Sequence, residues 1–112
     1  MKVKNDEIDI TQCSIAPVQK IISGKWNMVI LYFLNQGGVL RFGELQKKLP
    51  NVTQAALTKQ LRALEEYKLV HREVYKQVPP KVEYSLTEIG VNFLPVLTAL
   101  EEWATDYQKL EK

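Results

Sequence analysis

Cysteine is almost absent from this sequence, since Cys13 is the only one among 112 residues. A single cysteine excludes the disulfide framework that stabilises many small secreted domains. No apolar run approaches the roughly 20 residues that cross a bilayer as a helix. The first residues lead into no apolar segment of the kind found in secretory signals. We therefore expect a cytoplasmic protein with no membrane partner.

The residues that build most catalytic and metal sites are equally scarce. The one histidine, His71, and Cys13 cannot supply the three or four protein ligands of a zinc site. Glu65-Glu66 and Glu101-Glu102 are adjacent on predicted helices, so the two side chains of each pair diverge by about 100°. No glycine-rich phosphate loop occurs. We expect neither an enzyme nor a bound cofactor.

Positive charge is concentrated in the middle of the chain. The whole chain is 46% hydrophobic and 25% charged, which is typical of one soluble globular domain, and its net charge is only +2. Residues 41–86, however, carry nine Lys or Arg against five acids, whereas residues 87–112 carry two against five. A basic central segment suits a polyanionic partner, and the acidic end should point away from it.

The hydrophobic pattern predicts a mainly α fold with a small β-hairpin. Polar residues 1–12 are expected to form a flexible arm ahead of one domain over residues 13–112. Apolar spacing and helix-stop residues predict helices over 14–23, 26–36, 42–49, 54–67 and 88–111. Ser14, Thr53 and Thr87 are the expected N-caps. Pro95 should kink the last helix or delay its start.

The hairpin is expected between the fourth and last helices. Residues 70–77 and 81–86 are its predicted strands, and Pro79-Pro80 lies at the tip because proline cannot occupy a paired strand interior. Residues 39–41 are expected to form a short extended piece. Helices followed by a hairpin in this order are typical of a winged helix-turn-helix, with additional helices at both ends of the chain.

In such a domain the recognition helix, here at about 53–67, enters the major groove and the wing, here at about 70–86, lies beside it. The helix must expose small, polar and basic groups, because each base pair presents a distinct set of donors and acceptors there. The candidates for contacts with bases are Gln54, Thr58, Lys59 and Arg62. Ala55 is small enough to touch a thymine methyl, and Thr53 is included among the DNA-binding residues. The candidates for contacts with phosphates are Lys47, Lys48, Arg72, Lys76 and Lys81.

Two other interpretations fit the same pattern. The helix over 53–67 could be an ordinary surface helix with solvated charges, and the hairpin a sheet edge protected by proline and lysine. A winged helix can also serve as a protein-interaction module. Only the DNA-binding interpretation predicts an affinity for duplex DNA that falls steeply with salt.

Four stretches of the sequence carry a family resemblance: GKW at 24–26, RFGEL at 41–45, TQAALTKQLRALE at 53–65 and VPPKVEYSLT at 78–87. In this order they resemble the motifs of the HxlR-type family of bacterial winged-helix regulators, over residues 13 to 103. The resemblance implies a homodimeric transcriptional regulator that binds a pseudo-palindromic operator in double-stranded DNA. It selects no small-molecule inducer and does not distinguish a repressor from an activator.

The resemblance also implies that the first and last helices form the dimer interface. The last helix has more apolar surface than a small core can cover, which is typical of a partner surface. The alternative is that Trp103 and Tyr107 fold back onto the first helix of their own chain. Two-fold symmetry would place DNA half-sites about 10 bp apart, or a multiple of that. The interface candidates are Ile15, Val18, Ile22, Leu97, Leu100, Trp103, Tyr107 and Leu110.

Cys13 lies where family members carry a Cys-Pro pair that some of them use to sense oxidants or electrophiles. Here Ser14 follows instead of proline. A helix N-terminus can lower a thiol pKa, which favours the sensing hypothesis. With no second cysteine, only a bond between subunits or to a small thiol would be available. An inert, packed cysteine is the alternative.

Overall fold

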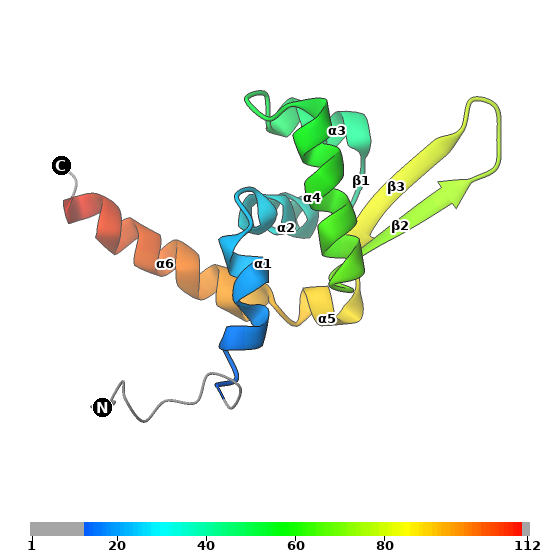
Figure 1. Cartoon of the computed structure of the whole chain (residues 1–112). Coiled ribbons are helices and arrows are strands. Elements are labelled where there is room, and N and C mark those ends of the chain that lie inside the picture. Colours follow the sequence, from blue (N-terminus) through cyan, green and yellow to red (C-terminus); the bar gives the residue numbers. More distant parts are fainter. Residues whose placement is uncertain (1–12, 111–112) are drawn as a thin grey trace.

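The computed structural model describes residues 13–110, which form several helices and a three-stranded sheet (Figure 1). The predicted arm over 1–12 lies outside the described residues. The mainly α fold with a small hairpin is confirmed. In chain order the elements are η3 (Ala16–Val18, a 3₁₀ turn), α1 (Gln19–Ser23), α2 (Asn27–Gly37), β1 (Val39–Arg41), α3 (Phe42–Lys48), α4 (Gln54–Glu66), β2 (Val70–Tyr75), β3 (Lys81–Leu86), α5 (Glu88–Val91) and α6 (Leu94–Leu110).

Two of the three predicted helix caps are confirmed. The Thr53 hydroxyl accepts a hydrogen bond from the Ala56 amide, and the Thr87 hydroxyl accepts one from the Gly90 amide, both at 3.1 Å. The prediction for Ser14 is wrong, because the first turn is η3, which has no side-chain cap. Pro17 explains this difference. A capping Ser14 oxygen would accept a hydrogen bond from the backbone N–H three residues later, and proline has no N–H.

The last predicted helix is two helices. It was expected to run over 88–111, but α5 ends at Val91 and α6 begins at Leu94, and residue 111 lies outside the described residues. Pro95 is the second residue of α6, where its missing N–H interrupts no helical hydrogen bond. Of the two expected effects of Pro95, a delayed start is the one observed.

The sheet has one strand more than the predicted hairpin. β3 lies between β1 and β2 and pairs antiparallel with both. The extended piece at 39–41 is therefore a paired edge strand, which a three-residue pattern is too short to reveal. β2 ends at Tyr75, earlier than expected, and the hairpin of β2 and β3, called the wing below, projects from the helical body (Figure 1).

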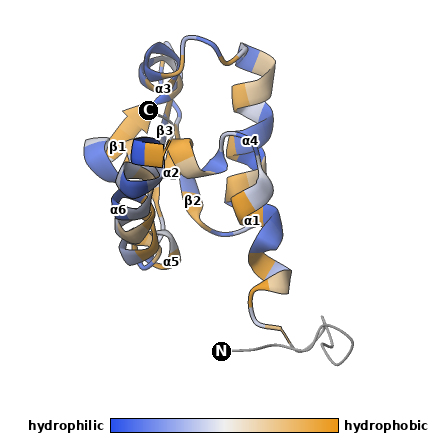
Figure 2. Ribbon diagram, turned by 90° about the vertical axis from the view of Figure 1, so that its left-hand side faces the viewer, coloured by the Kyte–Doolittle hydropathy of each residue, from blue (hydrophilic) through white to orange (hydrophobic). Residues whose placement is uncertain are grey.

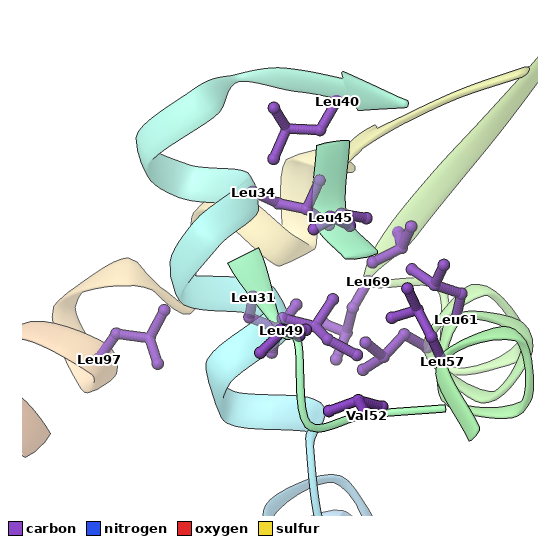
Figure 3. Close-up of a cluster of buried hydrophobic side chains, with 13 residues drawn as sticks. Leu31, Leu34, Leu40, Leu45, Leu49, Val52, Leu57, Leu61, Leu69 and Leu97 are labelled. Carbon is purple, nitrogen blue, oxygen red and sulfur yellow. The ribbon is translucent and has the colours of Figure 1, made fainter. Parts of the chain in front are cut away.

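The core lies where α2, α3 and α4 meet (Figure 3). Leu57, Leu61 and Leu64 are buried, as the spacing on the predicted recognition helix indicated. They pack in one cluster with apolar residues of the central helix α2 and with Leu45 of α3. Because one face of α4 is buried in this core, the opposite face of α4 points outward.

Leu97 corrects one prediction about the dimer interface. It was expected on the partner surface, but its side chain is only 6% exposed and belongs to the core. Figure 3 shows it apart from the main leucine cluster, on α6 where this helix meets α2. Leu97 therefore anchors α6 to its own chain. Within residues 13–110, no helix has both the length and the apolar character needed to cross a bilayer.

Candidate nucleic-acid interface

The outward face of α4 forms a shallow hollow on the protein surface. Ala55, Lys59 and Arg62 are exposed there, and Thr58 is half-buried. This is the arrangement that the sequence predicted for a recognition helix, because the exposed side chains are small, polar or basic. The residues that line the hollow are Gln54, Ala55, Thr58, Lys59, Arg62, Ala63 and Glu66.

Hydrogen bonds define what two threonines of α4 can offer a ligand. Thr53 caps the helix, so its hydroxyl oxygen is engaged by the Ala56 amide. The Thr58 hydroxyl donates to the Gln54 carbonyl at 2.9 Å. Thr58 therefore presents oxygen lone pairs and a methyl group, which suit a base amino group or a thymine methyl but cannot donate to a phosphate.

Two lining residues, Ala63 and Glu66, were missed in the sequence interpretation. Both follow Lys59 at helical spacing, and the exposed face of a helix continues through positions three and four residues apart. The sequence carries this signal, but the predicted contact set ends at the basic residue Arg62. Glu66 adds a carboxylate at the far end of the hollow.

Three of the predicted phosphate ligands are exposed at the ends of secondary-structure elements. Lys47 and Lys48 end α3, and Lys76 follows β2 at the wing tip. The Lys48 ammonium lies 5.4 Å from the centre of the Phe33 ring, where the ring face attracts a cation. These side chains place positive charge at the end of α3 and at the tip of the wing.

The other two predicted phosphate ligands lie on opposite faces of the wing. Arg72 is opposite Tyr84 in the strand register, and Lys81 is opposite Tyr75. Side chains alternate along a strand, so the two pairs point in opposite directions. The Arg72 Nε lies 3.4 Å from Glu65 Oε1 at the end of α4. The Arg72 face of the wing therefore turns toward α4, and the Lys81 face turns away.

Lys81 is held within the wing. Its Nζ lies 3.2 Å from Glu83 Oε2 and 4.9 Å from the centre of the Tyr75 ring. A hydrogen bond with Glu83 raises the pKa of Tyr75, and the same bond lowers the pKa of Glu83, whose partial burial acts in the opposite sense. Glu83 is thus a carboxylate at neutral pH and offsets part of the Lys81 charge.

An apolar stripe on α6 is left uncovered. Trp103 is 60% exposed, and its ring stacks on Tyr107 with 5.1 Å between ring centres. The alternative that these two rings fold back onto the first helix of their own chain is therefore wrong. Figure 1 shows α6 projecting away from the wing and the helical body. The other exposed apolar residues of α6 are Val96, Leu100 and Leu110.

The segment of η3 and α1 also carries exposed apolar residues, namely Ile15 just before η3, Val18 in η3 and Ile22 in α1. Figure 2 shows that hydrophobic and hydrophilic segments are interleaved along α1. Cys13 is exposed just before this segment. In the part of the chain that the structure describes, no three His, Cys, Asp or Glu residues are grouped to hold a metal ion.

Comparison with known proteins identifies relatives that are helix-turn-helix regulators. The model of the HxlR-like helix-turn-helix family matches residues 21–112. The HTH-type transcriptional regulator YdeP of Bacillus subtilis is 48% identical over 100 residues, which cover 89% of this chain and 77% of YdeP.

Two solved proteins share the fold. The crystal structure of a putative HTH-type transcriptional regulator, ytcD, has a TM-score of 0.82 and 41% identity, and the match covers 88% of this chain and 99% of the other. The redox regulator HypR in its reduced form also has a TM-score of 0.82, with 42% identity over 88% of this chain and 96% of HypR. In its oxidised form HypR has a TM-score of 0.77 and 45% identity, over 84% of this chain and 96% of HypR.

Proposed function

The chain belongs to the HxlR-like helix-turn-helix family of DNA-binding transcriptional regulators, and from this premise we propose that it binds a pseudo-palindromic operator as a homodimer. The resemblance inferred from its four motifs is confirmed. The observation that carries the proposal is the exposed face of α4, which presents small, polar and basic side chains along an open hollow. A protein-interaction module would not need this set of base-reading groups.

We assign base contacts to the first three turns of α4. Gln54 can pair with the edge of an adenine, and Lys59 or Arg62 with a guanine. Ala55 and the Thr58 methyl are small enough to approach a thymine methyl. Phosphate contacts are assigned to Lys47 and Lys48 at the end of α3 and to Lys76 at the wing tip. Phosphate contacts position the helix, and base contacts give it sequence preference.

The homodimer is proposed to form through the segment of η3 and α1, which was predicted as the first helix, and through α6. The support is the exposed apolar surface at Ile15, Val18 and Ile22 and along α6, since such surface is costly to leave in water. Leu97 is not part of this surface. Two-fold pairing would present two copies of α4 to one duplex, with half-sites about 10 bp apart or a multiple of that.

The test is a titration with duplex DNA from the region upstream of the gene, at several salt concentrations. The logarithm of the binding constant should fall linearly with the logarithm of salt concentration, with a slope of roughly 0.9 per phosphate contact. Arg62→Ala should cost about 1–3 kcal/mol on the preferred site and much less on unrelated duplexes. Lys109→Ala, at the far end of α6, is the matched control. Binding that is absent or independent of salt would favour the interaction module instead.

Redox control is a second candidate, because one solved protein of similar fold is named a redox regulator and Cys13 is exposed. Two Cys13 thiols, one from each subunit, would lose two protons and two electrons to an oxidant as the disulfide forms. A thiol oxidant such as diamide should then change the DNA affinity of the native protein but not that of Cys13→Ser. An equal response of both proteins would exclude this role.

A further inference from the structure

A second, smaller cavity of about 140 Å³ lies between α4 and the wing. We call it the cleft niche. It adjoins the hollow on α4, because Thr58 and Arg62 line both. Its remaining walls bring together side chains from two elements. The residues that line it are Thr58, Arg62, Glu65, Arg72 and Tyr84.

The strand register and one ion pair build the niche. Arg72 and Tyr84 are direct cross-strand partners, so both side chains lie on the wing face that turns toward α4. Across the gap, Arg62 and Glu65 are three residues apart on α4 and share one side of the helix. The ion pair of 3.4 Å between Glu65 and Arg72 joins the two walls.

The chemistry of the niche suits an anion with a single negative charge. Two guanidinium groups and one carboxylate leave a formal charge of +1. The Glu65 carboxylate engages Nε of Arg72, so the terminal nitrogens of this guanidinium remain as donors. Burial raises the pKa of Tyr84, so its hydroxyl is a neutral donor at physiological pH. Arginine forks and hydroxyl groups are suitable donors for phosphate oxygens.

The position of the niche indicates the source of such an anion. When α4 lies in the major groove and the wing reaches the adjacent minor groove, the sugar-phosphate strand that separates the two grooves passes between them. We propose that the niche holds one backbone phosphate of the bound duplex, with Arg72 and Tyr84 as its ligands and Glu65 positioning Arg72. This inference rests on the proposed DNA-binding function. It gives Tyr84, which no sequence motif suggested as a ligand, a direct contact with DNA.

The test replaces single phosphates of the upstream duplex, one at a time, with neutral methylphosphonates. The native protein should lose affinity at each contacted phosphate. Tyr84→Phe should weaken binding to the unmodified duplex by roughly threefold to tenfold. Arg72→Gln should weaken it by roughly tenfold or more, because the hydrogen bond that it removes joins two charged groups. At one methylphosphonate per half-site, each variant should lose less affinity than the native protein does, because only one of the two ligands of that phosphate remains. At all other positions each variant should lose as much affinity as the native protein.

Two matched variants control for general effects. Tyr75→Phe removes a hydroxyl from the opposite face of the wing, and Lys109→Gln removes a positive charge from the end of α6. Both should retain the native pattern of methylphosphonate sensitivity. Circular dichroism and thermal melting establish that each variant is folded. If Arg72→Gln does not fold, Tyr84→Phe decides alone, since it keeps the aromatic ring in place.

The outcomes separate the two proposals. Salt-dependent binding in which Tyr84→Phe keeps every methylphosphonate penalty of the native protein overturns the phosphate site and leaves the DNA-binding function standing. If the native protein shows no salt-dependent binding to the duplex, both the phosphate site and the DNA-binding function are overturned. A penalty that is smaller than in the native protein at the same single position in both Tyr84→Phe and Arg72→Gln supports the niche.

Discussion

The hydroxyl of Thr87 donates a hydrogen bond to the carbonyl oxygen of Lys68 at 2.6 Å, across 19 residues of sequence. The same residue accepts a bond from the Gly90 amide, and its own amide donates to the Leu69 carbonyl at 3.0 Å. Thr87 thus joins the segment that leaves α4 to the start of α5, at the base of the wing. This connection fixes the direction in which the wing leaves the helical body.

Thr87→Val should lower the free energy of unfolding by about 1–3 kcal/mol. The substitution removes the N-cap of α5 and leaves the Lys68 carbonyl without its partner, while keeping the shape of the side chain. Urea denaturation measures the loss. Thr87→Ser keeps the hydroxyl and should cost much less. Equal losses in the two variants would show that the hydroxyl is not the stabilising group.

Lys68→Gly should raise the free energy of unfolding by roughly 1 kcal/mol. Lys68 follows α4 with a φ of 67°, where a side chain is strained and glycine is not. The backbone bonds from Lys68 to Glu65 and from Leu69 to Leu64 close the helix end in this conformation and do not require the lysine side chain. Thermal or urea denaturation measures the change. Lys59→Gly, in the interior of α4, is the opposed control and should destabilise by about 1 kcal/mol.

The recognition helix could be predicted from the sequence because its determinants are local. Thr53 begins it through a bond to a residue three positions away, and leucines at 57, 61 and 64 define its buried face. Once this face is known, the exposed side chains follow from the geometry of a helix. The same reasoning placed Thr87 at the start of α5.

Features that depend on pairing between distant segments could not be predicted in this way. The separation of Arg72 and Lys81 onto opposite faces of the wing depends on the register between β2 and β3. The third strand exists only because β3 offers a free edge to residues 39–41. Leu97 is one of several apolar residues on α6, and which of them is buried depends on how α6 packs against α2. A periodic pattern identifies apolar faces but not their partners.

Lys76→Ala should weaken binding to all duplexes more than Lys81→Ala does. Lys76 is exposed at the wing tip, whereas the Lys81 charge is offset by Glu83 at 3.2 Å on the wing face turned away from α4. Removal of a phosphate contact should also reduce the salt slope by about 0.9, and we expect that reduction for Lys76→Ala only. Binding titrations at three salt concentrations measure both effects. The reverse order of the two variants would place the duplex against the other face of the wing.

Trp103→Glu should dissociate the proposed homodimer, because it places an unpaired charge in the centre of the exposed apolar stripe on α6. Burial of such a charge costs about 3–5 kcal/mol, so the dimer dissociation constant should rise more than a hundredfold. Sedimentation equilibrium measures it, since the native protein should have twice the mass of the 12.9 kDa chain. Gln108→Glu adds the same charge well away from the stripe around the helix and should leave the dimer intact.

The Trp103→Glu monomer presents one α4 instead of two, so its salt slope on operator DNA should fall to about half of the native value. A variant that stays dimeric and keeps the full slope would place the interface elsewhere on the chain.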